Sequence, residues 1–251
     1  MDWAESEYLR ERLNPRFGDQ FYLHLSDLLI AIKHLRPASI SKVLDYGCGG
    51  SPYRQLFEEC VYHRADLRGG TNLDFEFGPD AHLPPELSNY DCVLSTQVLE
   101  HVENPKGYLD ECYRVLRPGG YLILTTHGLF KDHACPYDYW RWTALGLKRA
   151  VESANLRVEA VKKLTTGLRG ATFLAERELY TDEGERLKID FRAAGLYGMT
   201  LSFFLRLLRR LGSARRHKAS DALFTNCRVV DIGDAGHNSY VAIAVLATRE
   251  G

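Results

Sequence analysis

A short run with two glycines, Asp45-Tyr46-Gly47-Cys48-Gly49, is the part of the sequence best suited to bind a ligand. Gly47 and Gly49 allow the backbone to turn sharply and leave no Cβ in the way of a ligand. The dinucleotide fingerprint G-x-G-x-x-G would need a glycine where this chain has Pro52, so that match fails. Asp45, two residues before the first glycine, suits a ligand that carries an ammonium group rather than a pyrophosphate. The run therefore predicts a ligand-binding turn, with a purely structural turn as the alternative.

Two histidines follow apolar runs that we expect to be buried strands. His101 comes after the run 90–95, and His127 comes directly after the run 121–126. An imidazole at the carboxyl end of a strand can accept a hydroxyl proton near neutral pH. His127 and His101 are therefore the candidate catalytic residues, and for His101 a structural or cofactor-side role is the alternative.

The segment 132–143 is dense in aromatic rings and is predicted to be a loop that leads into a helix capped by Thr143. Loops at this end of an open sheet often carry specificity. Aromatic walls with a few polar groups suit a sugar or another ring-bearing substrate, whereas the alternative is that the tryptophans only pack the helix onto the sheet. The candidate substrate-binding residues are His133, Tyr137, Asp138, Trp140 and Arg141.

The elements that must position these residues alternate between short β-rich runs and helical runs. The predicted strands are 41–46, 60–66, 90–95, 121–126, 156–164 and 239–246, and the predicted helices are one opened by Pro52 and those at 105–116 and 143–154. Such alternation predicts an α/β fold, with a mostly parallel sheet and helices on both faces. In this fold ligands bind at the carboxyl ends of the strands, where the glycine run and both histidines are placed.

Two further segments lie outside this alternation. Residues 1–37 are predicted to be helical, because leucines and an isoleucine recur at helical spacing before Pro37. Residues 165–236 do not follow the alternation and are predicted to be a mainly helical insertion. We therefore expect an N-terminal helical cap at 1–37, a core domain formed by 38–164 and 237–251, and a substrate lid at 165–236.

Composition narrows the class of protein. The 251 residues are 45% hydrophobic with a net charge of −1. This composition excludes wholesale disorder, and the near-zero net charge provides no overall positive electrostatic field that would attract nucleic acid. The six cysteines form no C-x-x-C pair, so we expect no metal and buried, reduced thiols. The N-terminus resembles no signal peptide, and no apolar stretch of about 18 residues exists. These features favour a cytoplasmic protein.

The insertion contains a basic stretch. Between Phe191 and Ser220 there are seven Lys or Arg residues and no acidic residue. Within 196–218, apolar residues fall on one helical stripe and arginines on another. Such a helix can lie on an anionic membrane surface or bind a phosphorylated substrate. A lid helix with a solvated basic face is the alternative.

Several segments together resemble the class I S-adenosylmethionine-dependent methyltransferases. The glycine run resembles motif I of that family, although Ser51 stands where the family often has a third glycine. Further segments that resemble the family, in the same order, are Asp66 at the end of the second strand, 80–84, 90–102 and 114–120. The resemblance covers residues 41 to 126 and implies a Rossmann-like, seven-stranded, mostly parallel sheet whose last strand is antiparallel.

The resemblance also implies a cofactor and its contacts. S-adenosyl-L-methionine would be the cofactor and S-adenosyl-L-homocysteine the product, with Asp45, Gly47 and Gly49 at the methionine part, Asp66 at the ribose, and the pair 80–81 at the adenine. The complete set of residues expected at the cofactor is Asp45, Tyr46, Gly47, Cys48, Gly49, Asp66, Leu67, Asp80, Ala81, Ser95 and Gln97.

The expected function is methyl transfer to a small molecule, with a hydroxyl on a sugar or other secondary metabolite as the leading acceptor. The acceptor could be a glycan or be nucleotide-linked or lipid-linked, with peripheral membrane contact through 196–218. The alternatives are a cofactor-binding protein without catalysis and a methyltransferase that acts on RNA or protein. A nucleic-acid partner is disfavoured by the neutral charge, and the sequence does not predict the oligomeric state.

Overall fold

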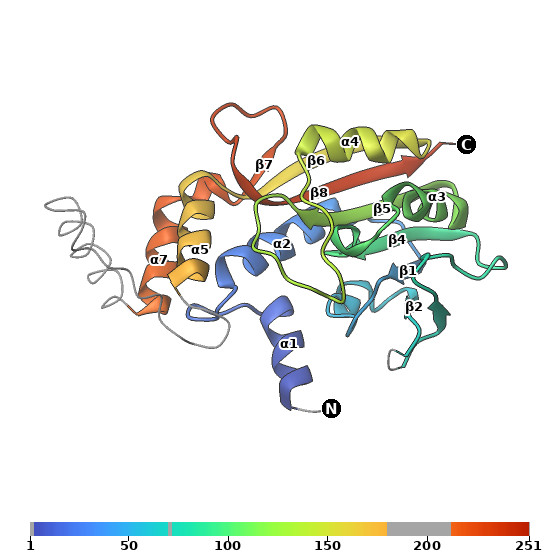
Figure 1. Ribbon diagram of the computed structural model, residues 1–251, viewed down its shortest axis with the longest axis horizontal. Coiled ribbons are helices and arrows are strands. Elements are labelled where there is room, and N and C mark those ends of the chain that lie inside the picture. The colour runs from blue at the N-terminus through green and yellow to red at the C-terminus, as the bar shows by residue number, and fades with distance from the viewer. Residues whose placement is uncertain (1–2, 70–71, 180–211, 251) are drawn as a thin grey trace, which may run out of the picture.

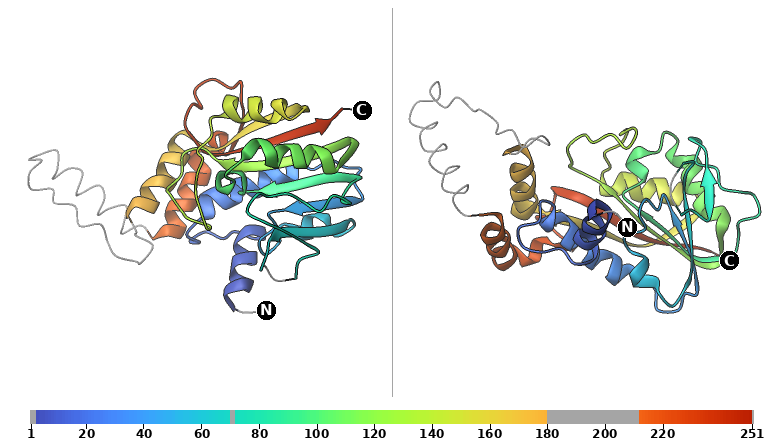
Figure 2. Two further views of the ribbon diagram at one scale, coloured as in Figure 1. Left: turned by 45° about the vertical axis from the view of Figure 1, so that its right-hand side comes forward. Right: turned by 90° about the horizontal axis from the view of Figure 1, so that it is seen from below.

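A single mixed sheet organises the molecule (Figures 1 and 2). The computed structural model describes residues 3–69, 72–179 and 212–250. Within them the sheet has eight strands in the order β3-β2-β1-β4-β5-β8-β6-β7. The strands are β1 (Lys42–Tyr46), β2 (Val61–Leu67), β3 (Phe75–Phe77), β4 (Tyr90–Thr96), β5 (Leu116–His127), β6 (Leu156–Thr166), β7 (Val229–Asp231) and β8 (Tyr240–Arg249).

The first five strands of the sheet pair in parallel, and the last strand in the sequence reverses direction. β8 is antiparallel to both of its neighbours, β5 and β6, and β7 is antiparallel to β6. The α/β class, the mostly parallel sheet and the antiparallel last strand are therefore confirmed. The expected count of seven strands is exceeded by one, because β7 adds an edge strand next to β6.

Helices cover both faces of the sheet (Figures 1 and 2). They are α1 (Trp3–Leu13), α2 (Tyr22–Leu35), α3 (Pro105–Val115), α4 (Ala144–Ser153), α5 (Gly167–Leu179) and α7 (Ser213–Leu223), with short 3₁₀ turns η1 (Arg54–Phe57), η2 (Leu99–His101) and η4 (Thr225–Cys227). Successive residues of β4 serve opposite faces, since Val93 packs with α3 and α4 while Cys92 and Leu94 pack with α2. This alternation is the pleat of a strand that is buried on both sides.

Local sequence features account for the helix boundaries. Asn104 caps α3 by accepting a hydrogen bond from Gly107 N, with Pro105 at the first helical position. Thr143 caps α4 by accepting one from Gly146 N at 3.1 Å, as predicted.

The expected helix after Pro52 is wrong, because the chain forms only the four-residue 3₁₀ turn η1 there. This turn already buries Phe57 completely, and the chain must enter β2 at Val61.

The segment 165–236 contributes strand residues to the sheet, which a purely helical insertion would not. Its described part contains α5 and α7, but also the end of β6 and the strand β7. Residues 180–211 lie outside the described residues, and so does most of the basic stretch 196–218. Its described end lies in α7, where Arg216 donates a 2.6 Å hydrogen bond to Glu176 of α5. No helix in the described ranges is long and apolar enough to cross a membrane.

All six cysteines are free thiols. Cys48, Cys92 and Cys112 are buried, as expected. Cys135 is exposed, which corrects the expectation of burial for that residue, because it lies in the loop between β5 and α4 rather than in the core.

Candidate active site

A cavity of about 650 Å³ opens at the carboxyl ends of the parallel strands. Its floor is made by the residues that follow β1 and end β2, β4 and β5, as expected for a ligand site in an open α/β sheet. Of the candidate residues, those that line it are Gly47, Cys48, Gly49, Asp66, Leu67, Ala81, Gln97, His101, His127, His133 and Tyr137. The cavity therefore brings the predicted cofactor, catalytic and substrate residues together.

The glycine turn shows why its first position cannot carry a side chain. Gly47 has φ +75°, and a Cβ there would lie 2.6 Å from both methyl groups of Val98. Gly49 has φ +49°, which also favours glycine. The backbone of this turn thus forms a cradle at the cavity that any Cβ at Gly47 would disrupt.

Asp66 lies at the rim of this cradle. Its carboxylate accepts hydrogen bonds from Gly49 N at 2.5 Å and from Leu67 N at 2.7 Å. A half-buried carboxylate that is held in place by backbone donors and lines a cavity is suited to accept hydrogen bonds from ligand hydroxyls.

Three of the predicted cofactor residues lie behind the cavity wall. Asp45 is buried and accepts a 2.6 Å hydrogen bond from Tyr62 Oη, and burial raises the pKa of Asp45 to about 7 against the lowering effect of this bond. Tyr46 stacks on Tyr108 with ring centroids 4.1 Å apart, and the Tyr108 hydroxyl also pairs with Ser95 at 2.8 Å. These residues support the cradle from beneath rather than lining the cavity.

Of the two residues expected at the adenine, only one lines the cavity. Ala81 lines the cavity with φ +57°, and its carbonyl accepts a hydrogen bond from the Tyr46 hydroxyl. Asp80 is not among the lining residues.

Four histidines that line the cavity gather around one buried glutamate. We call Glu100, His24, His101, His127 and His133 the histidine cluster. The Glu100 carboxylate is completely buried, and its Oε1 lies 3.2 Å from His127 Nε2 and 4.0 Å from His101 Nε2. The His127 ring centroid lies 5.7 Å from that of His24 and 5.0 Å from that of His133.

The electrostatics of the cluster favour neutral groups. Burial raises the pKa of Glu100 to about 7, although Thr126 Oγ1 donates a 2.8 Å hydrogen bond to its Oε2. Burial and the neighbouring histidines lower the pKa of His127 well below its usual value. The cluster also leaves buried atoms without a hydrogen-bond partner among the described residues, namely Glu100 Oε1, His127 Nδ1 and His24 Nδ1.

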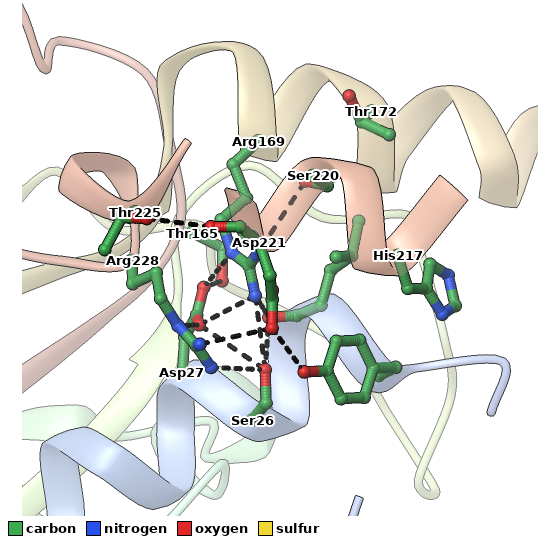
Figure 3. Close-up of polar contacts among 12 residues, drawn as sticks. Ser26, Asp27, Thr165, Arg169, Thr172, His217, Ser220, Asp221, Thr225 and Arg228 are labelled. Carbon is green, nitrogen blue, oxygen red and sulfur yellow. Dashed lines mark hydrogen bonds and ion pairs between the residues drawn. The ribbon is translucent and has the colours of Figure 1, made fainter. Parts of the chain in front are cut away.

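A second buried polar cluster begins one helical turn further along α2 (Figure 3). We call Asp27, Arg169, Asp221 and Arg228 the arginine–aspartate network. Arg169 Nε and Arg228 Nε donate to the two Asp27 oxygens at 2.7 and 2.8 Å, and Arg169 Nη1 donates to Asp221 at 2.6 Å. Thr165 Oγ1 adds a 3.0 Å hydrogen bond to Asp27. The network ties α2 to α5, α7 and the residue after η4.

The loop between β5 and α4, residues 128–143, which we call the substrate loop, contains residues that face the cavity and residues that hold the loop in place. His133 and Tyr137 line the cavity, whereas Asp138, Trp140 and Arg141 do not. Arg141 donates to both Asp138 oxygens at 2.6 Å, and these hydrogen bonds hold the pKa of Asp138 at about 2. Trp140 Nε1 donates to the Val102 carbonyl at 2.8 Å. These three contacts fix the conformation of the loop.

Sequence reasoning missed the residues that roof the cavity. They are Tyr8 and Arg12 of α1, Phe21 and His24 at the start of α2, Phe130 and Lys131 in the substrate loop, and Arg177 of α5. The sequence could have predicted that His24 faces inward, because it precedes Leu28 by four residues and so lies on the same apolar face of α2. No local pattern marks the others individually, although 1–37 and 165–236 were expected to cover the substrate.

The fold and the cavity define a class I S-adenosylmethionine-dependent methyltransferase. Residues 17–161 match the model of a methyltransferase domain family, which is more than half of the chain. The chain therefore belongs to this family, and S-adenosylmethionine is its cofactor.

Curated relatives carry the name ubiquinone biosynthesis O-methyltransferase. The protein from Parvibaculum lavamentivorans is 27% identical over 143 residues, which cover 51% of this chain and 52% of that protein. The protein from Maricaulis maris is 31% identical over 107 residues, which cover 36% and 42%. The chain thus matches about half of the length of these relatives.

Solved structures share the fold. A methyltransferase from Thermotoga maritima, described as a possible histamine N-methyltransferase, superposes with a TM-score of 0.52 over 97% of this chain and 99% of that one, at 15% identity. At this identity the likeness concerns the fold alone.

Proposed function

We propose that this protein transfers a methyl group from S-adenosylmethionine to a hydroxyl of a small, ring-bearing acceptor. The observation that carries the proposal is the continuity of the cavity, which runs from the glycine cradle and Asp66 to the histidine cluster. Methyl transfer requires cofactor and acceptor to meet in one water-poor space, with the acceptor oxygen ready to lose its proton.

At the cofactor end, the residues fit the group that the family uses. The backbone of Gly47 and Gly49 would hold the methionine part, the Asp66 carboxylate would accept the ribose hydroxyls, and Ala81, with Asp80 beside it, would border the adenine. Asp45, Tyr46 and Ser95 would keep this cradle in shape from beneath. When bound, the cofactor supplies the activated methyl group.

At the acceptor end, aromatic rings and imidazoles line the cavity. Phe130, Tyr137 and Tyr139 offer flat apolar surfaces for a ring. Burial lowers the pKa of His127 and keeps its imidazole neutral, so a ring nitrogen is free to accept the hydroxyl proton, and the Glu100 carboxylate 3.2 Å away would stabilise the imidazolium that forms. Glu100 Oε1 also lies 4.0 Å from His101 Nε2. We propose that Asp138, Trp140 and Arg141 act by holding the substrate loop.

The flanking segments complete this proposal. Residues 1–37 would cap the cavity through α1 and α2, and the segment 165–236 would border it through Arg177 of α5. The names of the curated relatives support a hydroxyl acceptor on a small molecule, whereas a sugar remains the alternative ring-bearing acceptor.

The first test measures cofactor binding by calorimetric titration with S-adenosylmethionine and S-adenosylhomocysteine. We expect Asp66→Ala to weaken both by about 1–3 kcal/mol, because the ribose hydroxyls lose a charged acceptor. Glu76→Ala is the matched control, since Glu76 is the register neighbour of Asp66 on β3 but does not line the cavity. Equal affinities in both variants would remove Asp66 from the cofactor site.

The second test measures turnover with hydroxylated aromatic acceptors and glycosides, read as the gain of one methyl group by mass spectrometry. Turnover of a hydroxylated ring compound supports the proposal. Cofactor binding without turnover of any acceptor would instead support a binding protein that lacks catalysis.

A further inference from the structure

The histidine cluster contains a set of side chains that is suited to bind a metal ion. Glu100, His127 and His133 each offer one donor atom, and these atoms all lie within 4.8 Å of one another. They come from η2, from the end of β5 and from the substrate loop, so no spacing along the sequence could have predicted them.

The separation of two of these donors already matches a metal site. Glu100 Oε1 and His127 Nε2 are 3.2 Å apart, yet Glu100 Oε1 has no hydrogen-bond partner among the described residues. Two ligands with bonds of about 2.0–2.1 Å to one tetrahedral ion lie roughly 3.3 Å from each other. The third donor, on His133, would need to move by at most about 1.5 Å, and it belongs to a loop.

Contacts around these donors orient them as outer contacts orient metal ligands. Thr126 Oγ1 holds the other oxygen of Glu100 at 2.8 Å, and the ring of Phe130 stacks on His127 with centroids 3.8 Å apart. His133 Nδ1 lies 3.2 Å from the Lys131 carbonyl and 3.4 Å from Asp138. This arrangement leaves His133 Nε2 available, and Arg141 in turn fixes Asp138.

We propose that Glu100, His127 and His133 bind one divalent transition-metal ion, with Zn²⁺ as the best-suited ion. Two imidazoles and one carboxylate are a ligand set of zinc and of ferrous iron, whereas Mg²⁺ prefers oxygen ligands alone. Because His127 and His133 both line the cavity, the remaining coordination position faces the proposed acceptor. As to its role, the inference rests on the proposed function: the ion would bind the acceptor hydroxyl and lower its pKa, and because His127 is then a ligand, His101, which also lines the cavity, would accept the released proton in its place.

The direct test is Zn²⁺ titration of the chelator-treated full chain, followed by calorimetry and by elemental analysis after dialysis. The experiment uses the Cys135→Ser background, so that the exposed thiol near His133 does not bind the ion itself. We expect one Zn²⁺ per chain, with an affinity that falls at least about tenfold in Glu100→Gln. Glu176→Gln is the matched control, because Glu176 is also a largely buried glutamate next to a histidine, His217, but lies outside the cavity.

A second variant and a second readout guard against a folding defect in Glu100→Gln. His133→Asn removes a half-buried loop residue, and both variants are checked by thermal unfolding. With Co²⁺ in place of Zn²⁺, we expect visible absorption bands of a nitrogen- and oxygen-ligated site that change in His133→Asn and persist in Glu176→Gln.

The outcomes separate this inference from the proposed function. Absence of Zn²⁺ binding, or equal affinity in the parent, Glu100→Gln and His133→Asn, would overturn the metal site, even if the protein methylates a hydroxyl. Stoichiometric binding that depends on Glu100 and His133 supports the metal site, even if no acceptor is turned over. Turnover by the parent that is unchanged by chelation would overturn the role of the ion in catalysis.

Discussion

The two buried polar clusters differ in how completely their groups are paired. Both begin on α2, where His24 belongs to the histidine cluster and Asp27, one turn later, belongs to the arginine–aspartate network. Asp27 receives hydrogen bonds from two arginines and a threonine. The histidine cluster leaves Glu100 Oε1, His127 Nδ1 and His24 Nδ1 without a hydrogen-bond partner among the described residues.

This difference separates a structural cluster from a functional one. Buried polar groups are normally hydrogen-bonded, and each exception costs stability. The arginine–aspartate network follows this rule and joins helices that are distant in the sequence. The histidine cluster departs from it at the edge of a cavity, where a ligand can supply the missing partners. Buried polar atoms that lack hydrogen-bond partners are expected at functional sites, where the needs of function compete with stability.

The largest expected effect follows from breaking the paired cluster. Asp27→Ala leaves the completely buried Arg169 without its main counter-charge, and we expect a loss of about 3–5 kcal/mol in the free energy of unfolding. Urea denaturation checks this. Lys106→Ala, which removes an exposed ion pair with Asp110, is the control and should change stability by less than about 1 kcal/mol. A similar small change in Asp27→Ala would contradict the structural role of the network.

An intermediate effect on activity, without a loss of stability, is expected in the unpaired cluster. Glu100→Gln keeps the shape of the side chain and removes a charge that is costly to bury, so the free energy of unfolding at pH 8 should stay equal or rise. Methyl transfer should fall about a hundredfold, because the variant loses the carboxylate that lies against His127 and that we propose as a metal ligand. Steady-state kinetics and urea denaturation are compared on the same sample. A variant that is both active and destabilised would place Glu100 with the structural residues.

The smallest expected effect concerns pH and the contact between α5 and α7. Burial raises the pKa of Glu176, but hydrogen bonds from His217 and Arg216 outweigh it and lower the pKa below the ordinary value. A lowered carboxyl pKa stabilises the fold above the unfolded value of about 4.3, and this contribution is lost as the pH falls through the folded pKa. The stability difference between the parent and Glu176→Gln should therefore shrink on acidification from pH 6. Urea denaturation across this range measures it, and a constant difference would argue against an ionised Glu176.

The sequence predicts the residues around the glycine cradle better than it predicts the histidine cluster. The glycine turn, Asp66 and Gln97 come from short segments that directly follow or end strands, so strand alternation alone places them together. The histidine cluster draws on α2, η2, β5 and the substrate loop, and its geometry depends on how these pack.

Dependence on tertiary packing also explains the predictions that were wrong or incomplete. Burial of Phe57 stops the helix after Pro52 at four residues. The edge strand β7 has only three residues, too few to show an alternating pattern, and it forms through pairing with β6. Asp138 and Arg141 carry groups suited to a substrate, but their mutual hydrogen bonds direct them to the loop itself.

The pairing of Asp27 also bears on the order in which the chain can fold during synthesis. Its arginine partners lie 142 and 201 residues later in the sequence. At roughly 5–20 residues per second, a ribosome needs about 10–40 seconds to travel from Asp27 to Arg228. Until Arg169 has been made, α2 has an aspartate without either arginine partner, and burying it is costly. Although α2 emerges from the ribosome before any strand, we therefore expect it to dock late, after the C-terminal part of the chain has appeared.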